Sequence, residues 1–298
     1  MTLPRQVIPG SFYKITRRCT QRQCLLHPNP VTNEIFLYCL AEAAQRFDIE
    51  VMLPTALSNH HHTDIFDRHG NVIPFVEHFH RLLAKSMNAY LGRSENFWSS
   101  EQVSIVRIED PADVIDKLVY TALNPVAADL VERVADWPGV SGLEDLLAQR
   151  TITVKRPSCF FSANGSMPET VTLSLVIPPE LGDSDAIRRE LRERVAAGEL
   201  RLAAERTQAG RRVLGRRGIL KRSWRDFPAT EAPRRGLRPR FAARSRAVLE
   251  AAIQRYHEFL CAYRQARRAW LEGEAPHFPA GTYWLQRFAG VTVAPLFQ

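Results

Sequence analysis

The sequence predicts an α+β fold, an antiparallel sheet with helices packed on it. Two patterns predict this fold class: apolar residues alternate in some segments, as in half-buried strands, and recur at helical spacing in others. Along the first half of the chain these segments follow the order strand, helix, strand, strand, helix, strand, helix. That order fits a sheet covered by helices. The 298 residues are enough for a full hydrophobic core and about two domains.

The elements of the first half are separated by turn-forming residues. They are a strand at 11–19, a helix at 34–47, strands at 50–56 and 59–66, a helix at 74–90, a strand at 102–108 and a helix at 110–124. Thr32 or Asn33 is expected to cap the first helix. Pro125 is expected to end the last helix and to begin a new turn or short helix, because the residue before a proline avoids the α region.

The composition changes after the Trp-Pro-Gly segment at 137–139. The expected elements there are strands at 151–154 and 170–177, an arginine-rich helix at 184–202, a basic loop or hairpin at 210–218, an irregular segment at 228–239 and a long helix at 242–271. We therefore expect one domain at 1–145 and a mostly helical, basic extension at 146–298 that packs on it.

The net charge of +8 is concentrated in one segment. Residues 201–246 contain fifteen Lys or Arg and three acids, a net charge of +12, so the other 252 residues sum to −4. This asymmetry is typical of a segment that binds a polyanion such as nucleic acid. The alternative is a solvated, arginine-rich surface.

Several classes of protein are disfavoured by the sequence. No run of about 18 apolar residues is present, so we expect no membrane partner. The N-terminus lacks the apolar core of a signal peptide. The five cysteines are an odd set without CxxC pairs, which suits reduced thiols in the cytoplasm better than disulfides.

Three consecutive histidines end an apolar run at 51–57. In a strand, alternate side chains share a face, so His60 and His62 would point the same way and His61 the opposite way. Two neutral imidazoles on one face can hold one metal ion. The alternative is a polar strand end whose histidines only form hydrogen bonds.

Tyr120 and Asn124 have the i, i+4 spacing that places two side chains on one helix face. Taken singly, they could be a packing residue and a helix stop. If the helix packs beside the histidine strand, His60, His62 and the Asn124 amide oxygen form a three-ligand site with open positions. Such mixed N and O ligands suit Mg²⁺ or Mn²⁺, with zinc tolerated. The open positions would hold phosphate oxygens while the Tyr120 hydroxyl attacks phosphorus.

Together these residues resemble those of the HUH single-tyrosine transposases, and more narrowly the REP-associated tyrosine transposases and their insertion-sequence relatives. The resemblance extends from about residue 10 to 142, roughly half of the chain. The motifs that carry it are Asn59-His60-His61-His62, Tyr120-Thr121-Ala122-Leu123-Asn124-Pro125-Val126, Phe97-Trp98-Ser99 and Trp137-Pro138. His61 departs from the family, in which the middle residue is usually bulky and apolar or aromatic.

The resemblance implies a ferredoxin-like or RRM-like catalytic domain that cleaves and rejoins single-stranded DNA. It implies that His60 and His62 hold the divalent metal, and that Tyr120 forms a covalent 5′-phosphotyrosine link and frees a 3′-hydroxyl. It implies a bacterial, nucleoid-associated protein, monomer or homodimer, that acts on hairpins in palindromic repeats without a nucleotide cofactor.

Arginines and a lysine outside the motifs are candidate DNA contacts. Arg17 and Arg18 could contact the strand near the active site. A second group could clamp the hairpin backbone: Arg211, Arg212, Arg216, Arg217, Lys221 and Arg222. For any one of them a solvated surface residue is the alternative.

Two other functions remain open from the sequence. One is a domesticated, non-catalytic protein that recognises palindromic repeats. The other is an unrelated metal hydrolase with a water nucleophile, for which Asp64 is the nearest general base.

Overall fold

The computed structural model describes residues 3–228 and 239–296, so most of the segment expected to be irregular at 228–239 lies outside the described residues. Its centre is a five-stranded sheet in the order β2-β3-β1-β4-β7. The strands are β1 (Ser11–Arg18), β2 (Glu50–Leu57), β3 (His60–Asp67), β4 (Ser104–Ile108) and β7 (Phe241–Ala242). The first four pair antiparallel, and β7 pairs parallel with β4.

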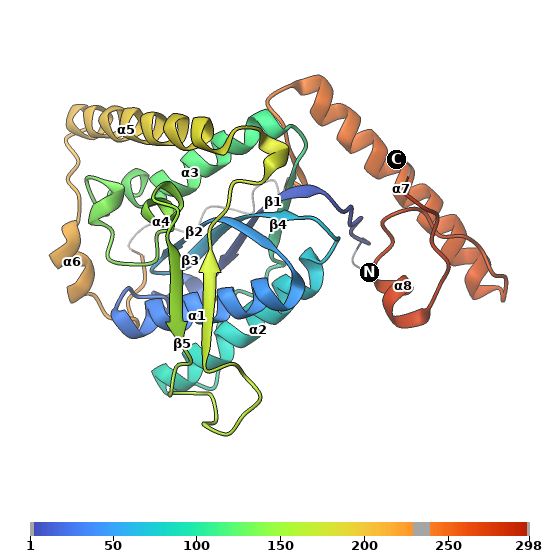
Figure 1. Ribbon diagram of the computed structural model, residues 1–298, viewed down its shortest axis with the longest axis horizontal. Coiled ribbons are helices and arrows are strands. Elements are labelled where there is room, and N and C mark those ends of the chain that lie inside the picture. The colour runs from blue at the N-terminus through green and yellow to red at the C-terminus, as the bar shows by residue number, and fades with distance from the viewer. Residues whose placement is uncertain (1–2, 229–238, 297–298) are drawn as a thin grey trace.

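Helices cover both faces of this sheet (Figure 1). Helices α1 (Pro30–Phe47) and α2 (Val72–Leu91) lie on one face. Helix α3 (Val114–Ala127) lies on the other face, where it contacts β2 and β3, and α5 (Ser184–Gln208) packs on α3. The order β1-α1-β2-β3-α2-β4, with β1 between β3 and β4, is the ferredoxin-like arrangement. The predicted fold class is confirmed.

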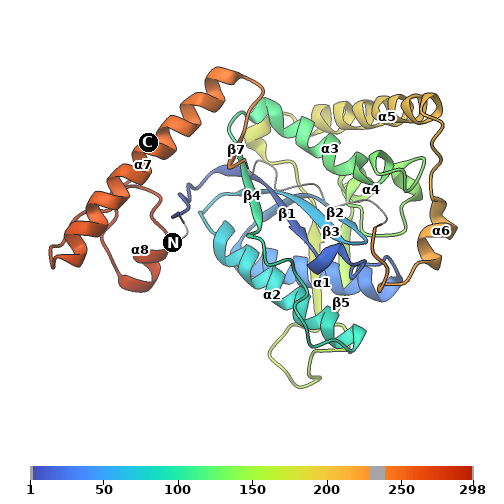
Figure 2. The ribbon, with the colours of Figure 1, turned by 180° about the vertical axis from the view of Figure 1, so that it is seen from behind.

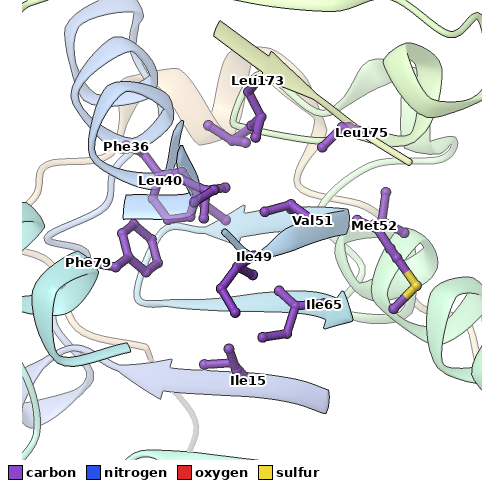
Figure 3. Close-up of a cluster of buried hydrophobic side chains, with 14 of the residues drawn as sticks. Ile15, Phe36, Leu40, Ile49, Val51, Met52, Ile65, Phe79, Leu173 and Leu175 are labelled. Atoms are coloured by element: carbon purple, nitrogen blue, oxygen red, sulfur yellow. The ribbon is translucent and has the colours of Figure 1, made fainter. Parts of the chain in front are cut away.

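The alternation of side chains along the strands creates two different faces. Ile15 of β1 and Ile65 of β3 point to the side of α1 and α2, where they are fully buried with Phe36 and Phe79 (Figure 3). The residues that alternate with them along the strands, such as Lys14 and Thr16, therefore face α3. The apolar face holds the fold together, and the polar face carries the candidate site.

Helix α1 begins earlier than the sequence suggested. Asn29, not Thr32 or Asn33, is the cap: its Oδ1 accepts a hydrogen bond from the Thr32 backbone N–H at 2.9 Å. Pro30 follows at the first helical position, where its missing N–H would have no partner in any case.

Helix α3 continues through Pro125 to Ala127, so the expectation that it ends at the proline is wrong. Pro125 lies in the last turn and gives up only the N–H that would bond to the Thr121 carbonyl. The N–H of Ala128, three residues after the proline, still donates to the Asn124 carbonyl at 3.0 Å. Asn124 is therefore held in helical geometry, one turn after Tyr120.

The second half of the chain supplies a hairpin and further helices. They are α4 (Leu143–Leu147), β5 (Thr151–Lys155), β6 (Thr170–Ser174), α6 (Gly215–Lys221), α7 (Arg246–Leu271) and α8 (Trp284–Ala289). Short 3-10 turns lie at Thr20–Arg22, Pro111–Asp113, Val134–Asp136 and Pro179–Leu181. The β5–β6 hairpin contacts α1. Among the described residues, no helix is long and apolar enough to cross a membrane.

Residues 210–214 of the loop or hairpin expected at 210–218 have no regular structure, but the rest of it belongs to helix α6. It forms because Ile219 is buried in the core, while the Ile219 carbonyl lies 3.1 Å from His27 Nε2 in a hydrogen bond. This tertiary contact fixes a helical turn in a segment whose glycines and arginines alone predict none.

One hydrophobic cluster extends from Val7 to Ile219 and crosses the domain boundary expected at residue 145. Leu173 and Leu175 from the hairpin region belong to it (Figure 3). A second, small cluster of Tyr256, Phe259 and Leu260 belongs to α7. Independent folding of residues 1–145 stays a prediction.

Candidate active site

Strand β3 places its histidines on opposite faces of the sheet. It pairs with β1 in unbroken register from His60 opposite Arg18 to Asp67 opposite Ser11, so its side chains alternate regularly. His60 and His62 lie on the α3 face. His61 lies on the other face and is fully buried.

His61 is a hydrogen-bonded core residue. Its Nδ1 lies 3.0 Å from Thr63 Oγ1, and its Nε2 lies 2.9 Å from Nε2 of His80 on α2. The ring packs edge-on against Phe36, Phe79 and Trp98. Burial lowers the pKa of His61 to about 3, with a smaller contribution from the charge of His60, so the ring is neutral near pH 7. His61 thus takes the place of an apolar core residue.

His60, His62 and Asn124 converge on the α3 face. The two imidazole rings lie 5.0 Å apart between centroids and nearly perpendicular, at 89°. Asn124 Nδ2 donates to His62 Nε2 at 3.1 Å and the amide also hydrogen-bonds to the His60 ring. These contacts join residues 62 positions apart in the sequence. The spatial grouping expected from the sequence is present.

The protonation of the two imidazoles suits a metal ligand. His60 Nδ1 donates to Asn59 Oδ1 at 2.7 Å, and His62 Nδ1 lies 2.8 Å from Thr16 Oγ1. With Nδ1 protonated, each Nε2 carries a lone pair, and that of His62 points toward Asn124. Burial lowers the pKa of His60 to about 4 and that of His62 well below its usual value, so both rings are neutral.

Two imidazoles and one amide are a fit for a divalent cation, because all three are neutral donors. A metal ion between them would replace the hydrogen bond from Asn124 Nδ2 to His62 Nε2. In residues 3–228 and 239–296, no cluster of three or more His, Cys, Asp or Glu could hold a metal ion. Any metal at this site would therefore rely on the Asn124 amide and on ligands from the substrate.

Tyr120 stands at the open side of the same group. Its ring lies 5.7 Å from the His62 ring, edge-on at 81°, and 56% of its surface is exposed. Most other aromatic side chains of the first 145 residues are packed in the core. An exposed tyrosine one turn before Asn124 is accessible to a strand of substrate.

A buried polar network lies behind Tyr120. Lys14 Nζ donates to Thr121 Oγ1, whose hydroxyl donates to Asp64 Oδ2 at 2.5 Å. Lys14 Nζ also lies 3.6 Å from Asp64 Oδ1 and 4.8 Å from the centroid of the Tyr120 ring. Burial lowers the pKa of Lys14 and raises that of Asp64, while their mutual attraction opposes both changes.

The sequence did not identify Lys14 or Thr121 as parts of the site. A lysine in the middle of an apolar strand was the available signal, since Lys14 alternates with the buried Tyr13 and Ile15. Asp64 does share the histidine face, as its spacing requires, but it is fully buried and engaged by Lys14 and Thr121.

A groove of about 510 Å³ runs between α3 and α5 beside Tyr120. Tyr120 and Asn124 line it together with Arg194, Arg201 and Arg244 from the second half of the chain. Close approach of the two helices depends on Gly198: a Cβ there would lie 2.3 Å from Leu123 Cδ1. The candidate site is therefore bordered by arginines that the sequence resemblance does not cover, each of them paired with a carboxylate.

The structure separates the two arginines expected near the site. Arg18 lies opposite His60 on β1 and its positive charge acts on His60 and His62. Arg17 lies opposite His61, so it points to the other face, where its guanidinium lies 5.8 Å from the Trp98 ring. The expectation that Arg17 reaches the strand at Tyr120 is wrong, because adjacent residues of a strand face opposite sides.

The other predicted DNA contacts lie along one segment. Leu214 and Gly215 donate backbone hydrogen bonds to Asp129 and Leu130, which ties this segment to the loop after α3. Arg211 forms an ion pair with Asp129. The remaining side chains are exposed on or beside α6: Arg212, Arg216, Arg217, Lys221 and Arg222.

Comparisons with known proteins find similarity among solved structures. No family model matches the chain, and no curated protein matches it. Among solved structures, the chain is similar to the structure of a REP-associated tyrosine transposase bound to a REP hairpin, with 18% sequence identity and a TM-score of 0.42. The match covers 50% of this chain and 86% of the other. The solved structure is of the family that the sequence resemblance names.

Proposed function

We propose that this protein is a metal-dependent strand transferase of single-stranded DNA that acts through a covalent phosphotyrosine. The observation that carries the proposal is the convergence of His60, His62, Asn124 and the exposed Tyr120 on one face of the sheet. The proposed ligands are His60, His62 and Asn124, and the proposed nucleophile is Tyr120. The proposed substrate is a DNA hairpin from palindromic repeats.

In the proposed reaction the Tyr120 oxygen attacks the phosphorus of a phosphodiester placed beside the two histidines. The bond from the tyrosine oxygen to phosphorus forms as the bond from phosphorus to the 3′-oxygen breaks. The tyrosine proton passes to solvent, to which this side chain is open, and the leaving 3′-oxygen takes up a proton. A bound Mg²⁺ or Mn²⁺ would neutralise charge on the phosphate oxygens. Reversal of these steps with another 3′-hydroxyl joins strands.

Lys14 and Asp64 have a supporting role in this proposal. The Lys14 ammonium lies 4.8 Å from the centroid of the Tyr120 ring, and this cation–π contact holds the ring in position. Asp64 and Thr121 hold the lysine in place. The burial of Asp64 also disfavours the alternative in which this carboxylate activates a water molecule.

The test uses a DNA hairpin with an unpaired flank, labelled at one end or the other. With Mg²⁺ or Mn²⁺, the wild-type protein is expected to release a fragment with a free 3′-hydroxyl and to keep the other fragment attached by its 5′-phosphate. Tyr120→Phe should abolish attachment and leave binding largely intact. Tyr90→Phe is the matched control, since Tyr90 lies at the end of α2, on the other face of the sheet.

Two results would contradict the proposal. Hydrolysis without an adduct would indicate a water nucleophile instead of Tyr120. Metal-independent binding of hairpins without any cleavage would favour the non-catalytic DNA-binding protein.

A further inference from the structure

Helices α7 and α8 lie on the opposite side of the molecule from α5 and α6 (Figure 2). A second groove lies there, between α7 and the end of the sheet that contains β4. Its volume is about 1010 Å³, at the upper end of the range for ligand sites. One wall is the last part of α7, and the other is the start of α2 and β4. It shares no lining residue with the groove at Tyr120.

The groove is positively charged. Its lining contains five arginines and two glutamates, Glu77 and Glu272. Arg264, Arg267 and Arg268 have the i, i+3, i+4 spacing of one helix face. Across the described ranges 3–228 and 239–296, none of the three forms an ion pair with a carboxylate. These cations are available to an external anion.

Two further arginines lie deeper in the groove. Arg5 Nη1 donates to the Ile105 carbonyl at 2.7 Å, and burial together with the like charge of Arg240 lowers the pKa of Arg5. Arg240 itself stacks 4.8 Å from the Tyr256 ring centroid. Two neighbouring cations without a carboxylate between them favour an anion such as a phosphate group.

The remaining surface of the groove is apolar and aromatic. Ile73, Val76 and Ile105 line its floor, and Trp284 lies at its side with 42% of its surface exposed. The indole is stacked on Phe288, with centroids 5.1 Å apart. A duplex presents only its charged backbone to such a hollow. An unpaired strand presents phosphates to the arginines and bases to the aromatic and apolar surface.

We infer that this groove binds an unpaired segment of a nucleic acid strand. The inference rests on the proposed function only for the class of substrate, which is single-stranded DNA. It adds a second site where that DNA contacts the protein, remote from Tyr120. The groove would hold the flank of a hairpin whose cleavage site lies at the histidines.

The test measures binding by fluorescence anisotropy, in EDTA, with the Tyr120→Phe protein. The probes are a labelled DNA hairpin with an unpaired flank and the same hairpin without it. The groove variant is Arg264→Gln with Arg268→Gln. The control removes the same charge from the exposed face of α5, by Arg189→Gln with Arg192→Gln.

The groove variant should bind the flanked hairpin at least about fivefold more weakly and the blunt hairpin unchanged. The slope of the logarithm of its binding constant against the logarithm of salt concentration should become less steep by roughly 1.4, because each lost phosphate contact of a single strand removes about 0.7. Trp284→Ala should weaken binding of the flanked hairpin by about fivefold or more, because the base loses its aromatic stacking partner. A flank that contains iodouracil should photo-crosslink to residues 263–284 of the protein whose groove is not substituted.

Equal losses for the two hairpins, wild-type affinity of the groove variant, or crosslinks confined to other segments would overturn the inference. An affinity that depends on the groove, without any cleavage, would support the groove inference and contradict the catalytic proposal. An adduct on Tyr120, with binding that does not depend on the groove, would support the catalytic proposal and contradict the groove inference. Failure of the wild-type protein to bind either hairpin would overturn both.

Discussion

At the scale of single residues, the site depends on polar side chains that satisfy one another inside the fold. Lys14, Asp64 and Thr121 form a network between β1, β3 and α3, and the Asp64 carboxylate is fully buried. A buried ion pair contributes little net stability, but removal of one partner leaves an uncompensated charge. The network therefore fixes the position of α3 against the sheet.

Lys14→Met should lower the free energy of unfolding by about 3–5 kcal/mol, because Asp64 would be left buried without its cation. Adding Asp64→Asn should restore much of that loss, so the two substitutions would not be additive. Urea unfolding of the single and double variants measures the coupling. Additive losses would show that the two side chains do not act as a pair.

The buried pair of His61 and His80 predicts sensitivity to acid. Burial lowers the pKa of both rings in the folded protein, that of His61 to about 3, whereas in the unfolded chain both titrate near 6.5. Below about pH 6.5 the unfolded state binds more protons, so stability falls as the pH falls. Two such groups give a slope that approaches about 2.7 kcal/mol per pH unit below about pH 5.5, where both imidazoles of the unfolded chain are protonated.

Urea unfolding between pH 7 and pH 5 in EDTA measures this slope. In the variant His61→Phe with His80→Leu, the slope of the unfolding free energy against pH should be smaller by the contribution of these two histidines, since neither replacement titrates. An unchanged slope in the variant would show that other groups cause the acid sensitivity.

The residues that short-range spacing can identify were predicted from the sequence. His60 and His62 follow from the period of a strand, and Tyr120 and Asn124 from the period of a helix. Lys14 could not be found this way, because its neighbour Asp64 is set by the register of β1 on β3. The opposite orientation of Arg17 and Arg18 follows from the period of the strand, but the register decides that Arg18 is the one on the face of His60.

At the scale of elements, α3 carries the proposed nucleophile and one proposed metal ligand, and α5 packs on α3 from outside. The two helices approach closely because Gly198 has no side chain where Leu123 packs. The Cβ of any other residue would meet Leu123 at 2.3 Å. The position of Tyr120 therefore depends on a helix from the second half of the chain.

Gly198→Leu should push α5 away from α3, lower the unfolding free energy by about 1–3 kcal/mol, and reduce the yield of the DNA adduct. Ala197→Leu is the control, because Ala197 is exposed on the neighbouring face of α5. Thermal unfolding and adduct yield are measured together. Equal effects of the two substitutions would exclude a specific contact at Gly198.

Element types were predictable from periodicity, and the differences have local causes at Asn29 and Pro125 and a tertiary cause at α6. The cap at Asn29 depends on a side-chain bond to Thr32, and α6 depends on the burial of Ile219. Pro125 could remain in α3 because it lies in the last turn. Periodicity does not contain these contacts.

At the scale of the whole molecule, the two halves share one core. Residues of β6 and α5, including Leu173 and Leu191, are buried in the same cluster as β1, β3 and α1. A boundary at residue 145 follows from the change in composition, but composition does not reveal which surfaces the second half covers.

A chain shortened after residue 145 should therefore lose cooperative unfolding. It would expose the apolar surfaces of α1 and α3, and the free energy of unfolding would fall by about 1.5–3 kcal/mol for each large side chain that loses its burial. A chain shortened after residue 227 keeps the whole first cluster and should unfold cooperatively. Circular dichroism during heating compares them. A shortened chain of 145 residues as stable as the full protein would contradict the shared core.

The most direct measurement of the central claim is the identity of the residue that carries DNA. After incubation of the full protein with a flanked hairpin and Mn²⁺, the adduct is digested and the modified peptide is sequenced by mass spectrometry. The expected result is a nucleotide 5′-phosphate on Tyr120, absent in EDTA and absent when His60 or His62 is replaced by alanine. An adduct on another residue, or one that persists in Tyr120→Phe, would contradict the assignment of Tyr120 as the nucleophile.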